Sequence, residues 1–147
     1  IESYLGRRAR RWDLTPEELI AKVEGMKNNL TTQFLLDHDL LYLDNFPIRR
    51  LFGPTLSQTQ PVTEDHYKAV AALLPQFDLI TTIENERERT KLLDKQLGWN
   101  VQMAEKVNSG PHPKFSKEFL PYIEELNKWT IALYHEAVRV MEENIAK

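Results

Sequence analysis

The sequence predicts an α/β fold in which helices cover a parallel sheet, with this chain supplying mostly helices. Two observations support this fold class. Apolar residues recur at helical spacing in several long segments. Between two of these segments, residues 77–83 read Phe-Asp-Leu-Ile-Thr-Thr-Ile, which is rich in β-branched residues and bounded by turn signals. A helix–strand–helix order is typical of the crossovers of parallel sheets.

The N-terminal third contains the clearest helix start. Residues 1–12 are expected to end one helix, and Thr15-Pro16-Glu17-Glu18 begins the next. Thr15 can cap the helix, Pro16 suits its first position and Glu18 completes a capping box. The apolar residues that follow at helical spacing are Leu19, Ile20, Val23, Met26, Leu30 and Phe34. The segment 37–62, with three prolines and a glycine, is expected to be an irregular surface loop.

The remaining elements follow in order. Thr63-Glu64-Asp65 begins a helix that Pro75 ends, and the strand over residues 77–83 comes next. Asn85 is expected to cap a helix that runs to Gly98, with its leucines facing inward. After a loop over residues 108–113, one long helix is expected from about 121 to 145. The inward leucines are Leu92, Leu93 and Leu97, and the apolar face of the last helix is Ile123, Leu126, Leu133, Tyr134, Ala137, Val138, Met141 and Ile145.

A single strand cannot satisfy its own backbone groups, so the predicted strand needs partners. Leu40–Leu43 could supply one, but a two-stranded sheet is marginal. The chain begins with Ile1 rather than methionine. We therefore expect a chain cut from a longer one, with the rest of the sheet preceding Ile1.

Composition narrows the functional classes. The 147 residues fit one domain over 1–147, and 41% hydrophobic with 28% charged residues is ordinary for a globular protein. A formal charge of −3 does not suggest a nucleic-acid binder. Without cysteine there is no disulfide or thiolate metal site, and no apolar run is long enough for a membrane segment. The four histidines show no spacing typical of metal ligands.

Four landmarks, taken in order, resemble the carbohydrate sulfotransferase family that includes the heparan sulfate 6-O- and 2-O-sulfotransferases. Ile1-Glu2-Ser3-Tyr4-Leu5 resembles the tail of the 3′-phosphate motif R-D-P-x-x-R-x-x-S, with Ser3 as its serine. Asn29-Leu30-Thr31-Thr32-Gln33-Phe34-Leu35 is similar to the N-x-Q-x-R-x-L helix, although Gln33 stands at the arginine position.

The other two landmarks lie in the second half of the chain. Phe77-Asp78-Leu79-Ile80, followed by Glu84, Leu92-Leu93 and Leu97-Gly98-Trp99, looks like the strand and helix "FDLV…E…LL…LGW". Leu126-Asn127 with Leu133-Tyr134 and Ala137 resembles the closing "LN..D..LY..A" helix, with Thr130 at the aspartate position. The order and spacing of the landmarks carry the resemblance, because none of them is specific alone.

The resemblance implies the C-terminal, mostly helical part of a P-loop-like sulfotransferase fold. Its donor would be 3′-phosphoadenosine-5′-phosphosulfate, and its acceptor a hydroxyl group, most simply of a glycan. Ser3 would contact the 3′-phosphate of the donor, and Arg7 and Lys114 are further candidates for binding its anionic groups. The structural alternatives are an ordinary helix serine, a solvated arginine-rich helix face and a plain surface lysine.

The resemblance also places the phosphosulfate loop and the catalytic base before Ile1. No catalytic residue is therefore assigned in this chain, and the isolated chain is expected to be inactive. Two other functions stay open: a non-enzymatic helical module that binds a partner protein between its helices, and a phosphotransferase of related architecture. The acceptor, the oligomeric state and the compartment, cytoplasmic or Golgi lumen, are not determined by the sequence.

Overall fold

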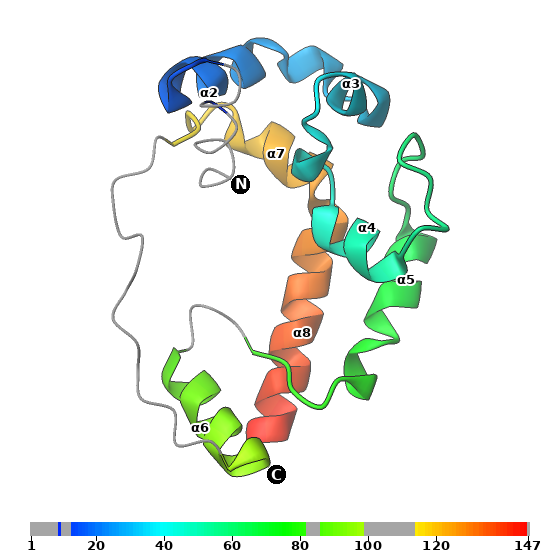
Figure 1. Cartoon of the computed structure of the whole chain (residues 1–147), viewed down its shortest axis with the longest axis vertical. Helices are drawn as coiled ribbons and strands as arrows, with labels where there is room; N and C mark the ends of the chain where they lie inside the picture. The colour runs from blue at the N-terminus through cyan, green and yellow to red at the C-terminus, as the bar shows by residue number, and fades with distance from the viewer. Residues whose placement is uncertain (1–8, 10–12, 82–85, 99–113, 147) are drawn as a thin grey trace.

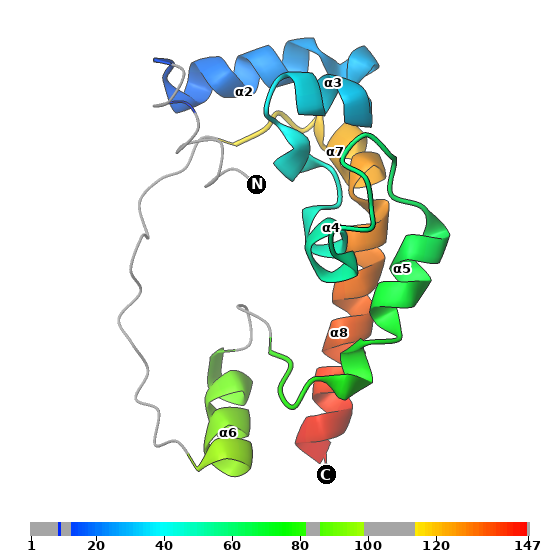
Figure 2. The same cartoon turned by 45° about the vertical axis from the view of Figure 1, so that its right-hand side comes forward.

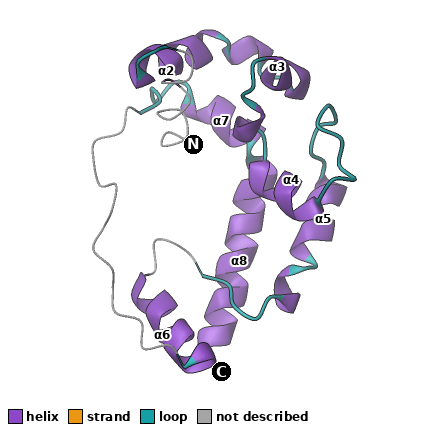
Figure 3. Ribbon diagram, viewed as in Figure 1, coloured by secondary structure: helices purple, strands orange, loops and turns teal. Residues whose placement is uncertain are grey.

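The described part of the chain consists of helices joined by short loops (Figures 1 and 3). A computed structural model describes Ala9 and residues 13–81, 86–98 and 114–146. The elements are α2 (Pro16–Gly25), α3 (Thr32–Asp37), α4 (Phe46–Phe52), α5 (Glu64–Ala71), α6 (Glu86–Leu97), α7 (Leu120–Leu126) and α8 (Lys128–Ala146), with the 3₁₀ helices η1 (Lys27–Asn29), η2 (Leu41–Leu43) and η3 (Leu74–Gln76). No residue in these ranges lies in a strand. The predicted α/β fold with a parallel sheet is therefore wrong for the described chain.

The strand predicted over residues 77–83 is also wrong. Residues 77–81 form a loop after η3, and residues 82 and 83 lie outside the described part. The side chain of Phe77 is 43% exposed, whereas Ile80 packs against a hydrophobic cluster without any strand pairing. No described segment forms a strand beside this stretch. Without a neighbouring strand, its backbone N–H and C=O groups can bond to water in an exposed loop.

The capping box at the start of α2 is confirmed. The Glu18 N–H donates to the Thr15 hydroxyl at 3.2 Å, and the Thr15 N–H donates to the Glu18 carboxylate at 2.7 Å. The backbone hydrogen bond from Thr15, supported by the Thr15 hydroxyl, lowers the pKa of Glu18 from its ordinary value. The carboxylate therefore stays charged beside the positive end of the helix dipole.

Helix α2 ends earlier than the apolar spacing predicts. It stops at Gly25, the 3₁₀ helix η1 follows, and Thr31 then caps α3 by accepting the Phe34 N–H at 3.2 Å. The Thr31 hydroxyl caps a new helix at this point, and this favours a second helix start over continuation of α2. The continuous helix expected as far as Phe34 is therefore divided.

Helix α4 lies within the segment expected to be an irregular loop. Asn45 precedes it in the left-handed backbone region, with φ 44°, and Gly53 follows it with φ 88°. Pro47 occupies the first turn, where a missing N–H costs nothing. A proline just inside a helix and a glycine just past it are helix-boundary signals, although the same residues also occur in loops.

The last predicted helix is two helices with a break at Asn127. The bounds of α6 agree with the sequence, but Leu97 at its end is 42% exposed, so its predicted inward direction is wrong. Tyr134 in α8 is likewise 42% exposed, whereas Leu133 and Met141 are buried as expected.

Two hydrophobic clusters are stacked along the molecule (Figures 1 and 2). The upper cluster joins α2, α3, η2 and α7, and includes Leu19, Val23, Leu35, Leu43, Phe119 and Ile123. The lower cluster joins α4, α5 and α8, and includes Ile48, Val70, Leu74, Leu133 and Val140. In both the η2–α4 and the α7–α8 connections, the chain passes from one cluster to the other through a buried polar segment.

Candidate functional site

A buried polar network occupies the passage between the two clusters. The Asn45 N–H donates to Asn127 Oδ1 at 3.2 Å, and Asn127 Nδ2 donates to the Leu43 carbonyl at 2.7 Å. Asn45 Nδ2 donates to the Leu126 carbonyl at 2.6 Å, and Asn45 Oδ1 accepts the Thr130 N–H at 2.9 Å. Asn45 thereby caps the N-terminus of α8 from a distant part of the chain.

Arg49 extends this network to the loop that follows α4. Its guanidinium pairs with Asp44 at 2.6 Å, and only 8% and 4% of the two side chains are exposed. Arg49 Nη2 also donates to the Gln60 carbonyl at 2.8 Å, and Nη1 donates to the Ser57 carbonyl at 3.4 Å. Asp44 in turn accepts the Thr32 hydroxyl at 2.8 Å. Arg49 therefore positions the loop rather than offering a free charge to a ligand.

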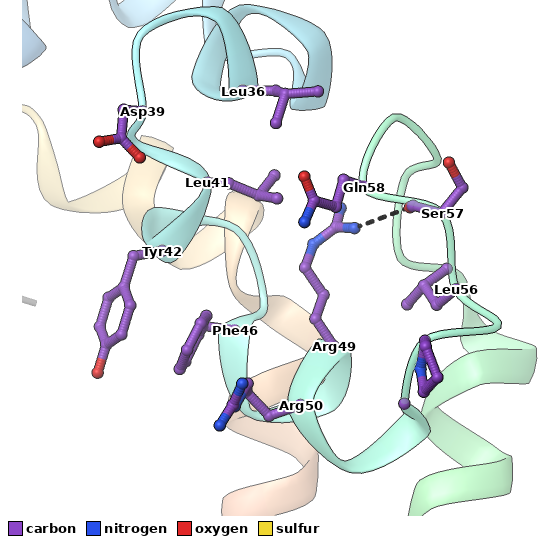
Figure 4. A pocket seen from close by; sticks show the side chains of 12 residues that line it. Leu36, Asp39, Leu41, Tyr42, Phe46, Arg49, Arg50, Leu56, Ser57 and Gln58 are labelled. Carbon is purple, nitrogen blue, oxygen red and sulfur yellow. Dashed lines mark hydrogen bonds between the residues drawn. The ribbon is translucent and has the colours of Figure 1, made fainter.

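A cavity of about 700 Å³ lies between η2, α4 and this loop (Figure 4). The rings of Tyr42 and Phe46 form one wall, with centroids 4.0 Å apart and planes tilted by 31°. The exposed guanidinium of Arg50 lies 5.9 Å from the centroid of the Phe46 ring. The other lining residues are Leu36, Asp39, Leu41, Arg49, Gly53, Pro54, Leu56, Ser57 and Gln58.

The charges around the cavity differ in their availability. The charge of Arg49 is balanced by its ion pair with Asp44 inside the protein. Arg50 has no ion-pair partner among the described residues, and it can accommodate a carboxylate, sulfate or phosphate group. Asp39 places a carboxylate on the opposite border of the cavity. Of the charged groups at the cavity, the exposed guanidinium of Arg50 can therefore contact an anionic group.

Of the residues predicted from the sequence to bind the donor, the structure describes only Lys114. Lys114 is exposed and directly precedes the buried Phe115, and it does not line the cavity. Ser3 and Arg7 lie outside the described residues. The role of the three residues in donor binding therefore stays a prediction.

Asn45 and Arg49 are not among the residues predicted from the sequence. They lie in the segment expected to be an irregular loop, because Pro47 and Gly53 favour a loop interpretation. Their buried contacts are made with residues far away in the sequence, such as Asn127, or depend on the fold of the loop that follows α4.

Thr130, at the aspartate position of the closing landmark, also belongs to the network. Its N–H bonds to Asn45, while its hydroxyl oxygen is buried and makes no hydrogen bond within the described structure. Thr130 thus lies next to the buried amides of Asn45 and Asn127. A buried hydroxyl without a partner costs stability relative to an apolar group of the same shape.

Replacing Thr130 with valine is therefore expected to leave the protein as stable or to stabilise it by up to about 1 kcal/mol. Valine keeps the shape of threonine and removes the unpartnered oxygen. Urea unfolding followed by circular dichroism measures the change, and Thr130→Ser, which keeps the hydroxyl and loses the methyl group, is the control. A loss of more than about 1 kcal/mol in Thr130→Val would show that the hydroxyl has a partner.

The described residues were also compared with the requirements of metal sites and membrane helices. No group of three or more acidic or histidine side chains is placed to hold a metal ion within the described ranges. None of the described helices combines the length and apolar character needed to cross a membrane. Comparisons with protein-family models, with curated proteins and with solved structures found no match to this chain.

Proposed function

We propose that the protein takes part in the transfer of a sulfuryl group from 3′-phosphoadenosine-5′-phosphosulfate to a hydroxyl group, most simply that of a carbohydrate. The proposal rests on the order and spacing of the four landmarks in the sequence. One observation is consistent with it: Thr32 of the second landmark and Asn127 of the closing landmark belong to the same hydrogen-bond network, which they join through Asp44 and Asn45.

In the proposed reaction, the acceptor oxygen forms a bond to sulfur as the bond between sulfur and the 5′-phosphate oxygen breaks. The acceptor proton passes to a base, and adenosine 3′,5′-bisphosphate leaves. Cationic groups stabilise the charge that develops on the leaving phosphate. The role proposed for this chain is to hold the 3′-phosphate through Ser3, with Arg7 and the exposed Lys114 supplying positive charge.

Replacing Ser3 with alanine is expected to weaken binding of adenosine 3′,5′-bisphosphate by roughly ten- to a hundredfold. The physical reason is the loss of one hydrogen bond to a charged phosphate, worth about 1.5–3 kcal/mol. Calorimetric titration of the intact protein measures the affinity. Adenosine 5′-phosphate, which lacks the 3′-phosphate, is the matched ligand control and should bind equally to both forms.

The same titrations include Lys117→Ala as a control for general loss of positive charge, because Lys117 is exposed a few residues after Lys114. It should leave both affinities unchanged. An equal loss for the two nucleotides, or no binding of either to the unaltered protein, would contradict the proposed donor.

A non-enzymatic helical module is the second candidate, and two observations favour it. All the regular secondary structure in the described part of the chain is helical. Several large apolar side chains of α7 and α8 are also exposed, which is typical of surfaces that bind other proteins when they are contiguous. These residues are Leu120, Tyr122, Ile131 and Tyr134. The nucleotide titration separates the candidates, because a binding module has no reason to distinguish the 3′-phosphate.

A further inference from the structure

We propose that a second cavity, between α4 and the corner where α7 meets α8, binds a small aromatic ring that carries an N–H donor and an alkylammonium group. Its volume is about 350 Å³, near the lower end of the range of about 300–1,000 Å³ in which proteins hold small molecules. A single ring system with a short side chain suits this volume. The lining residues are Tyr42, Phe46, Pro47, Ile123, Glu124, Asn127, Thr130 and Ile131.

The ring of the ligand is assigned to the apolar part of the lining. Tyr42 and Phe46 border this cavity as well as the larger one, and their ring centroids are 4.0 Å apart (Figure 4). Ile123 and Ile131 add aliphatic groups from α7 and α8. An aromatic ring buries a large area against such a surface and loses little conformational entropy on binding. The cavity therefore favours a flat ring over a flexible chain.

Glu124 determines the sign of the ligand's charge, because it is the one charged side chain among the described residues that line the cavity. It is exposed and has no ion-pair partner within the described part of the chain. Arg50 lies over the Phe46 ring, but it lines the larger cavity and not this one. An ammonium group beside Glu124 is attracted by the carboxylate, whereas a second carboxylate there would be repelled.

Thr130 supplies a hydrogen-bond partner that the described protein does not use. Its hydroxyl oxygen is buried and makes no hydrogen bond within the described structure. Because this oxygen is already removed from water, a ligand N–H that reaches it gains a bond at little cost of desolvating the hydroxyl. Threonine has two common rotamers in a helix, so rotation about its Cα–Cβ bond can turn the hydroxyl toward the cavity that Thr130 lines.

Asn127 also lines the cavity, but its side-chain amide is already bonded. Its Nδ2 donates to the Leu43 carbonyl at 2.7 Å and to the Ile123 carbonyl at 3.0 Å. Its Oδ1 accepts the Asn45 N–H at 3.2 Å. The amide therefore holds the wall of the cavity in place, and the polar groups of the ligand are assigned to the carboxylate and the hydroxyl described above.

This site does not depend on the proposed sulfuryl transfer, because no residue that lines it is assigned to the sulfate donor. NMR titration of the protein with tryptamine tests the binding. Tryptamine combines an indole ring, its N–H donor and an ethylammonium group. Its binding should saturate and should shift the methyl resonances of Ile123 and Ile131, which line the cavity.

Four related probes separate the contributions of the ring, the donor and the charge. 1-Methyltryptamine lacks the ring N–H and tryptophol replaces the ammonium group with a hydroxyl, and each should bind roughly three- to tenfold more weakly than tryptamine. Indole-3-propionate reverses the charge and should bind more than about tenfold more weakly. Ethylammonium, which has no ring, should not saturate in the same range.

The matched charge variants are Glu124→Gln, which removes the charge at the cavity, and Glu118→Gln, which removes an exposed charge that does not line it. Glu124→Gln should lower the affinity for tryptamine to that for tryptophol, and Glu118→Gln should leave both affinities unchanged. Because Glu124 is exposed, its variant should keep the urea midpoint of the unaltered protein.

Thr130→Val tests the hydrogen bond separately. It should weaken the binding of tryptamine by roughly three- to tenfold and leave the binding of 1-methyltryptamine unchanged, because only tryptamine has the ring N–H. The variant is expected to be at least as stable as the unaltered protein, so unfolding does not explain the weaker binding.

Absence of tryptamine binding, saturation by ethylammonium, or equal affinity for tryptamine and indole-3-propionate would each overturn the proposal. Equal effects of Glu124→Gln and Glu118→Gln would also overturn it, because the charge would then act from outside the cavity. An equal loss of tryptamine and 1-methyltryptamine binding in Thr130→Val would remove the hydroxyl as the partner of the ring N–H.

Discussion

Replacing Arg49 with methionine is expected to lower the free energy of unfolding by about 3–5 kcal/mol. Methionine fills much of the same volume but leaves the Asp44 carboxylate, 4% exposed, without its counter-charge. It also removes the hydrogen bonds that Arg49 donates to the loop carbonyls of Ser57 and Gln60. Urea unfolding followed by circular dichroism measures the loss.

The control for Arg49→Met is the same substitution at its neighbour, Arg50→Met. Arg50 is exposed and has no buried partner, so its loss should change stability by less than about 0.5 kcal/mol. The double variant Asp44→Asn, Arg49→Met should be more stable than Arg49→Met alone, because no unpaired buried charge remains. A single Arg49→Met loss below about 1 kcal/mol would mean that water solvates Asp44 without opening the fold.

Replacing Asn45 with alanine is expected to cost about 3 kcal/mol, from contributions of two kinds. The substitution leaves the Leu126 carbonyl and the Thr130 N–H, at the start of α8, without their side-chain partner. It also places a residue with a Cβ and no local hydrogen bond at φ 44°, where alanine is strained by about 1–2 kcal/mol. The free energy of unfolding in urea gives the total.

Asn45→Gly separates the two contributions, because glycine adopts this backbone conformation freely but makes no side-chain hydrogen bond. It should be about 1–2 kcal/mol more stable than Asn45→Ala. The exposed Asn28 provides the matched control, and Asn28→Ala should change stability by less than about 0.5 kcal/mol. Equal stability of Asn45→Ala and the unaltered protein would contradict the capping of α8 by this side chain.

Local signals predicted the helix starts better than the fold class. The hydrogen bonds of the capping box join Thr15 and Glu18, which are three positions apart, so the local sequence is enough to predict them. The strand over residues 77–83 depended on partners elsewhere, and its composition did not reveal whether they were present. At the break in the last helix, the Asn127 side chain bonds to Leu43 and Asn45, which lie far away in the sequence, so the sequence pattern did not reveal the break.

The candidate cavity was harder to predict than the helices. Apart from Leu36 of α3, its lining comes from residues 39–58, which lie within the segment interpreted as irregular. Proline and glycine occur both at helix boundaries and in loops, so these residues alone do not predict α4. The packing of Ile48 against α5 and α8 favours the helix, and the sequence does not show that packing.

The polar segment between the two hydrophobic clusters restricts how the halves of this fold can meet. Apolar surfaces tolerate sliding, because one buried methyl group replaces another at little cost. The crossed amides of Asn45 and Asn127 do not, since a shift of one residue would leave several buried donors and acceptors unmatched. The network therefore selects one alignment of α4 against the α7–α8 corner. Evolution could vary the apolar residues on either side while the geometry of the cavity beside α4 stayed the same.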